Sequence, residues 1–116
     1  MKYRKLRVQD LLKEEIALII QREVRDPGMG FITVLGAKMS EDLKDAKVYL
    51  SIYGDEVQKA ATLAALKRSK NYIKLLLGKR IQLRRMPELH FVIDDTYEKA
   101  ARIEEILKKE ANVQRD

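Results

Sequence analysis

Residues 46–53, AKVYLSIY, alternate strictly between small or aliphatic side chains and side chains that carry a polar group. This period of two predicts a β-strand with one apolar face and one mixed face. The apolar face would carry Ala46, Val48, Leu50 and Ile52, and the other face Lys47, Tyr49, Ser51 and Tyr53. Such a strand is stable only if neighbouring strands extend the sheet and another layer covers its apolar face.

The rest of the chain can supply both the strands and the covering layer. Phe31–Met39 is rich in β-branched residues and predicts a preceding strand, with Gly36 marking a β-bulge. The short polar turn after it predicts an antiparallel hairpin. A third strand is predicted over Leu89–Ile93, after Pro87.

Several helices are predicted around these strands. Residues 6–24 repeat apolar side chains at three- and four-residue steps, and Asp26-Pro27-Gly28 ends that helix. The stripe consists of Val8, Leu11, Leu12, Ile16, Ile19, Ile20 and Val24. A second helix begins at Asp55, a plausible N-cap, and a last one covers Tyr97–Glu110.

The apolar pattern of the second helix is interrupted by lysines after residue 66. If it continued without interruption, we expect Lys67 and Lys70 to enter its apolar line, which is energetically costly. The sequence therefore predicts a break over Lys67–Asn71, with Asn71 capping a further helix, Tyr72–Leu77, that Gly78 ends. The fold class is α+β, with residues 1–96 as one domain and residues 97–116 as a helical extension with a frayed tail.

The positive charge of the chain is concentrated in one segment. The net charge is +6, yet residues 57–87 contain nine basic residues and no acidic ones. The remainder has 15 basic and 18 acidic residues. Charge concentrated in this way favours a polyanion such as nucleic acid as partner. The alternative is a solvated face that keeps the protein soluble.

The corner predicted at Asn71 is the candidate binding site. The first N–H groups of a helix and its dipole favour phosphate there. Tyr72 could stack on a base, but we expect it to pack, partly buried. The candidate RNA-binding residues are Lys67, Arg68, Ser69, Lys70, Asn71, Lys74, Lys79, Arg80, Arg84 and Arg85.

Other classes of function find little support. His90 is the single histidine and has no evident partner, Asp94 and Asp95 are adjacent, and LLLGKR lacks the glycine and hydroxyl of a phosphate-binding loop. No catalytic residue, metal site or cofactor is predicted. The chain has no cysteine and no long apolar run, which predicts a cytoplasmic protein without a membrane segment.

Three further interpretations remain open. One is a DNA- or RNA-binding regulator that uses the basic helix-corner-helix face without sequence specificity. A helix-turn-helix over residues 57–78 would place Tyr72–Leu77 in the groove, with only Lys74 for base edges. The third is a module that binds an acidic protein.

The order of elements resembles the bacterial type (type II) of KH domain, α-β-β-α-kink-α-β. Within that type, three segments resemble the ribosome-binding factor A family: RVQDLLKEEIALIIQREVRDPGMGFITV, SEDLKDAKVYLS and ALKRSKNYIKLLLGKRIQLRRMPELHF. The resemblance covers residues 4–95. The family's Ala-x-Gly corner falls on Ser69, Lys70 and Asn71, so this chain departs from it at two of three positions.

The resemblance implies a non-catalytic assembly factor of the small ribosomal subunit. Such a protein would bind immature, free 30S subunits and their 16S rRNA, and not 70S ribosomes. It would assist late maturation, including processing of the 5′ end of 16S rRNA, and would favour growth in the cold. It is expected to act as a cytoplasmic monomer, with ribosomal proteins as further partners.

Overall fold

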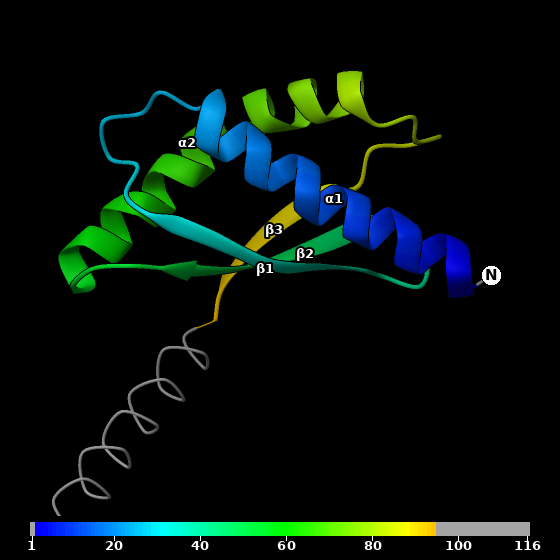
Figure 1. The fold of residues 1–116 in the computed structure, drawn as a ribbon, viewed down its shortest axis with the longest axis horizontal. Helices are drawn as coiled ribbons and strands as arrows, with labels where there is room; N and C mark the ends of the chain where they lie inside the picture. Colours follow the sequence, from blue (N-terminus) through cyan, green and yellow to red (C-terminus); the bar gives the residue numbers. More distant parts are fainter. Residues whose placement is uncertain (1, 95–116) are drawn as a thin grey trace, which may run out of the picture.

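The computed structural model describes residues 2–94, in which two helices cover one face of a three-stranded sheet (Figure 1). This is the α+β architecture that the sequence predicts. The elements are α1 (Lys2–Arg22), β1 (Ile32–Met39), β2 (Asp45–Ile52), α2 (Glu56–Arg80) and β3 (Glu88–Ile93).

The sheet has the order β1-β2-β3, so the alternating strand β2 is central. β1 and β2 form the predicted antiparallel hairpin, and their register shifts between Val34 and Gly36, which confirms the bulge. β3 runs parallel to β2. A parallel pair needs a long crossover connection, and α2 provides it.

The core lies between the sheet and the two helices. Val48 and Leu50 of β2 are fully buried, as are Leu12, Ile16 and Ile19 of α1. Leu11 was expected in the same stripe, but 40% of it is exposed. Successive helix residues are about 100° apart, and because Leu12 takes the centre of the buried face, Leu11 lies at its rim.

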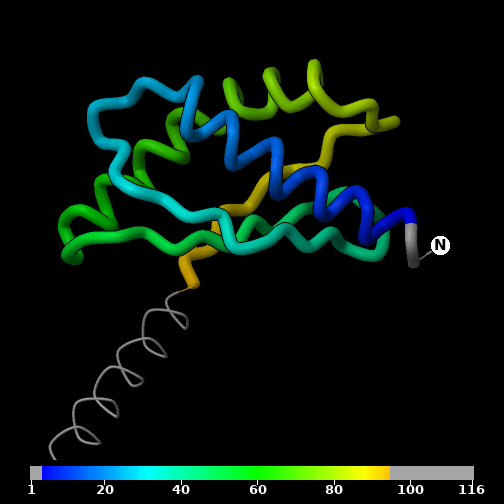
Figure 2. The backbone as a smooth tube through the Cα atoms, viewed as in Figure 1, coloured from blue at the N-terminus to red at the C-terminus, as the bar shows by residue number. Residues whose placement is uncertain are grey.

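The predicted break in the second helix is wrong, because α2 is one helix of 25 residues. The buried residues of α2 form a line from Thr62 through Leu66 and Ile73 to Leu77. The half-buried Ser69 lies on this line between Leu66 and Ile73. Lys67 and Lys70 flank this line instead of entering it, so no interruption is needed. Asn71 is therefore not a cap, and Gly78 lies inside the helix. In place of the predicted corner between two helices, α2 changes direction near its middle (Figure 2).

The ends of α2 are defined by capping interactions. The carboxylate of Asp55 accepts a hydrogen bond from the Gln58 N–H at 2.8 Å, and the Gln58 side chain accepts one from the Asp55 N–H at 2.8 Å. This capping box confirms the predicted N-cap. At the other end, the N–H of Ile81 donates to the carbonyl of Leu77 at 2.9 Å.

Two predictions fall outside the described residues. These are the last helix, Tyr97–Glu110, and the boundary at residue 96 between domain and extension. Among the helices of residues 2–94, none is long and apolar enough to cross a membrane.

Candidate nucleic-acid interface

Eight basic residues lie between Lys67 and Arg85, on the second part of α2 and the loop that follows it. The structure separates them into two groups of four. One group forms ion pairs with carboxylates from other segments, and the other group does not. The two groups therefore differ in how readily they can meet an external anion.

Arg68 fastens the loop between α1 and β1 to α2. Its Nε and Nη2 atoms donate to the two carboxylate oxygens of Asp26 at 3.1 and 2.9 Å, a bidentate pair. The N–H of Gly28 also donates to Asp26, at 2.9 Å. The hydrogen bonds from Arg68, and then that from Gly28, hold the pKa of Asp26 below its usual value.

Lys70 and Lys74 join α2 to β3. Their Nζ atoms lie 2.6 and 2.9 Å from the two carboxylate oxygens of Glu88 at the start of β3. The hydrogen bonds from Lys70 and Lys74, in that order, lower the pKa of Glu88 from 4.5 to about 2. Both lysine charges are thus balanced in part by one carboxylate before any ligand arrives.

Arg80, the last residue of α2, reaches back to α1. Its guanidinium lies 3.4 Å from the carboxylate of Glu15 and 3.5 Å from that of Glu23. The acids that meet Arg68, Lys70, Lys74 and Arg80 all lie outside residues 57–87. In the folded protein, these ion pairs therefore balance much of the excess positive charge of residues 57–87.

The second group is exposed and makes no ion pair within the part of the chain that the structure describes. It consists of Lys67, Lys79, Arg84 and Arg85, which we call the unpaired quartet. Lys67 and Lys79 lie on α2, and the two arginines lie in the loop before β3. These side chains can contact phosphates without first giving up an internal partner.

The outer side of α2 adds two exposed apolar side chains between the lysines. Tyr72 is 46% and Leu75 58% exposed. Tyr72 is thus partly buried, whereas Ile73 beside it takes the fully buried position. Its ring is free to stack on a base or to pack against a partner.

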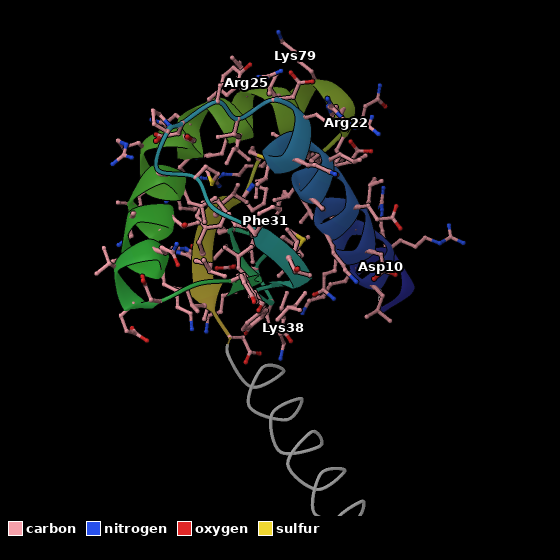
Figure 3. The ribbon with its side chains drawn as sticks, turned by 60° about the vertical axis from the view of Figure 1, so that its left-hand side comes forward. Asp10, Arg22, Arg25, Phe31, Lys38 and Lys79 are labelled. Carbon is pink, nitrogen blue, oxygen red and sulfur yellow. The ribbon has the colours of Figure 1, made fainter. Side chains whose placement is uncertain are left out.

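Two arginines near this surface were missed from the sequence because they lie outside the basic segment. Arg22 at the end of α1 and Arg25 in the next loop are exposed. Figure 3 shows both projecting outward on the same side of the molecule as Lys79. Only the folding of α1 against α2 brings them to this side, so no local pattern of charge could have revealed them.

The predicted phosphate site on free backbone N–H groups at Asn71 is wrong. In an uninterrupted helix, these groups donate to carbonyls one turn earlier. Ser69 is half-buried in the apolar line, whereas Asn71 is exposed. A helix-turn-helix over residues 57–78 is also excluded, because that range contains no turn.

His90 is an exposed residue of β3 and, contrary to expectation, it has a partner. Its Nε2 lies 2.8 Å from a carboxylate oxygen of Asp45 on the neighbouring strand β2. Within residues 2–94, no group of three or more histidine, cysteine or acidic side chains could hold a metal ion.

Fold and surface together define a KH-like α+β domain without a glycine loop, whose basic surface is formed by α2 and the loop after it. The chain belongs to the ribosome-binding factor A family, whose sequence model matches residues 4–107. It is 47% identical over 103 residues to ribosome-binding factor A of Halothermothrix orenii, covering 89% of this chain and 84% of that protein.

Solved structures of the family show the same fold. The crystal structure of ribosome-binding factor A from Thermus thermophilus superimposes with a TM-score of 0.69 at 29% identity, over 77% of this chain and 93% of that one. A homology model of the Thermus thermophilus protein, fitted into a cryo-EM map of its 30S complex, matches with a TM-score of 0.63 at 29% identity. That match covers 74% of this chain and 90% of the other.

Proposed function

We propose that this protein is an assembly factor that binds the 30S ribosomal subunit through 16S rRNA, using the unpaired quartet as its main phosphate contacts. The observation that carries the proposal is the fitted 30S complex of the Thermus thermophilus relative, together with family membership. The quartet supplies four cations that are exposed to solvent, as contact with an RNA backbone requires.

The paired cations have a second part in this proposal. Arg68, Lys70, Lys74 and Arg80 hold α2 against the α1–β1 loop, β3 and α1. They add to the positive potential of the surface while keeping it rigid. The exposed Asn71 allows RNA to approach the middle of α2, because its side chain is small.

The biological role that we propose is non-catalytic. The protein would bind free, immature 30S particles as a cytoplasmic monomer and leave before 70S ribosomes form. Its presence would assist late maturation, including processing of the 5′ end of 16S rRNA, and this assistance would matter most in the cold. Ribosomal proteins near the bound rRNA would be secondary partners, for which Tyr72 and Leu75 offer exposed apolar surface.

The test is the affinity of the purified full chain for free 30S subunits as a function of salt. Replacing the quartet with glutamine should weaken binding and reduce the slope of log K against log salt by about 0.7 to 0.9 for each phosphate that is no longer neutralised. The matched control removes four exposed basic residues elsewhere, Arg4, Arg7, Lys13 and Lys44. The same net charge is then removed from other positions.

The two variants separate specific contact from general attraction. A quartet variant that folds normally and binds like the natural protein contradicts the proposed contacts. Equal weakening in both variants would show that net charge alone drives binding. Sedimentation of cell extract, with detection of this protein, tests the role itself, since the proposal requires co-migration with free 30S subunits and not with 70S ribosomes.

A further inference from the structure

The face of the sheet that points away from α1 and α2 carries a second surface that the proposed function does not use. Side chains alternate along a strand, so the neighbours of buried core residues point to this open face. On β1 and β2 and the residues next to their ends, these include three aromatic and two basic side chains. They are Phe31, Tyr53, Tyr49, Lys38 and Lys47.

Phe31 and Tyr53 form an exposed aromatic pair at one end of the hairpin. The N–H of Tyr53 donates to the carbonyl of Phe31 at 3.0 Å, which continues the pairing of Ile32 with Ile52. Ile52 continues the alternation of the core residues Val48 and Leu50 and is buried, so Tyr53 beside it points to the other face. Phe31 is 83% and Tyr53 77% exposed. Because the two rings lie on directly opposite residues, they form contiguous exposed apolar surface, which marks binding sites more often than single exposed side chains do.

Tyr49 lies further along the same face, opposite a residue without a side chain. Its partner across the hairpin is Gly36, and a Cβ atom built there would meet nothing within 4 Å. The space beside the half-buried ring is therefore open. A flat group could enter and lie against the ring from the Gly36 side.

Two lysines stand next to this space. Lys38 and Lys47 are directly opposite each other across the hairpin, an arrangement of like charges that destabilises a sheet. Both line a shallow hollow of about 530 Å³ together with Tyr49 and His90. The acid in the hollow is Asp45, which contacts His90 and not the lysines. An external anion would relieve the repulsion between the two lysines.

We propose that this open face is a second RNA site, which binds single-stranded RNA. Unpaired bases would stack on Phe31 and Tyr53 at one end of the face and on Tyr49 further along, while Lys38 and Lys47, the next pair beyond Tyr49, contact phosphates at the other end. Aromatic side chains next to basic ones on an open sheet face fit unstacked bases, whereas a double helix keeps its bases inside. The inference rests on the proposed function only in taking RNA as the ligand, and it uses none of the unpaired quartet.

The test uses the full chain and a short fluorescein-labelled oligouridine, followed by fluorescence anisotropy. The double variant Phe31→Ser, Tyr53→Ser should bind on the order of tenfold or more weakly, because it removes the stacking surface for at least one base. The double variant Lys38→Gln, Lys47→Gln should reduce the salt slope by about 0.7 for each phosphate that is no longer neutralised. Unlabelled oligouridine should compete, whereas a duplex RNA should compete poorly.

Leu6→Ser on α1 is the matched control, because Leu6 is another large apolar side chain, 54% exposed, on a different element. It should leave oligouridine affinity unchanged. Unchanged affinity in the Phe31, Tyr53 variant, or an equal loss in Leu6→Ser, would overturn the inference. So would sedimentation of the free protein as a dimer that the aromatic variant dissociates, since a second copy would then occupy the face.

The same measurements distinguish this inference from the proposed function. The quartet variant should lose affinity for 30S subunits and keep its affinity for oligouridine. If the quartet variant loses both and the open-face variants lose neither, the second site is refuted while the proposed function stands.

Discussion

Gly78 lies inside the last turns of α2, where glycine has no conformational task. A Cβ added at this position would lie 3.6 Å from the terminal methyl group of Met86, an ordinary contact. Glycine in a helix is less favourable than alanine because it loses more backbone entropy on folding. Gly78→Ala should therefore stabilise the fold by about 0.5 to 1 kcal/mol, measured by urea denaturation.

Gly54 provides the contrasting control. Its φ is +130°, and an added Cβ would collide with the side chain of Gln58 in the capping box. Gly54→Ala should lower the free energy of unfolding. If Gly78→Ala also lowers it, α2 does not continue through residue 78 as described.

Asn71 is exposed in the middle of α2, and its replacement tests the continuity of the helix. A capping role would make Asn71→Ala destabilising by about 1 kcal/mol. In an uninterrupted helix, alanine is the better residue, so the change should instead be neutral or stabilising by up to about 0.7 kcal/mol. Asp55→Ala removes the real cap and should destabilise by about 1 kcal/mol in the same urea assay.

At the scale of elements, Thr62 holds the α1–β1 loop against α2. Its hydroxyl is buried, accepts a hydrogen bond from the Gly30 N–H at 3.1 Å and donates to the Gln58 carbonyl at 2.8 Å. Thr62→Val keeps the shape but leaves the Gly30 N–H without its acceptor. We expect a loss of about 1 to 3 kcal/mol in the free energy of unfolding. Thr62→Ser retains the hydroxyl and should recover much of that loss.

The contact of Glu88 with Lys70 and Lys74 makes the attachment of α2 to β3 depend on pH. The pKa of Glu88 falls from 4.5 to about 2 on folding, so the pair stabilises the folded protein fully above pH 4.5. That contribution disappears as the pH falls from 4.5 to about 2. Glu88→Gln should lower the urea midpoint at pH 7, and its difference from the natural protein should shrink through this window.

Glu41→Gln is the control for the removal of a carboxylate, because the Glu41 side chain is fully exposed and lies 3.6 Å from Lys5. It should change the midpoint less than Glu88→Gln at pH 7. A difference for Glu88→Gln that stays constant down to pH 2 would contradict the described ion pairs.

The sequence predicted elements well where one periodicity dominates. Along β2, buried and less buried side chains alternate without exception. The bulge at Gly36 and the N-cap at Asp55 depend on the properties of single residues and their immediate neighbours. The predicted break rests on placing Lys67 and Lys70 in the apolar line of α2, whereas that line runs from Leu66 through the half-buried Ser69 to Ile73. A shift of one residue turns the line by about 100° and moves the lysines out of the core.

At the scale of the whole molecule, charge along the chain is a poor guide to charge on the surface. Half of the basic residues between Lys67 and Arg85 meet acids from distant segments: Asp26, Glu88, Glu15 and Glu23. Sequence alone could name the basic stretch, but only the fold divides it into cations that hold elements together and cations that remain open. On the open face, the alternation of β2 predicts that Lys47, Tyr49 and Tyr53 share one side, but only the register of the hairpin brings Phe31 beside Tyr53 and Lys38 beside Lys47.

The described part of the molecule shares one core, and the central strand is its most sensitive part. Leu50 on β2 is fully buried, and it pairs with Val34 on β1 and Ile93 on β3. Leu50→Ala removes packing in the core and leaves a cavity, so it should destabilise by about 2 to 5 kcal/mol. Because α1, α2 and the sheet pack on this core, hydrogen exchange of the most protected amides in all three should accelerate by the same free energy. Acceleration confined to the sheet would show instead that the helices unfold as a separate unit.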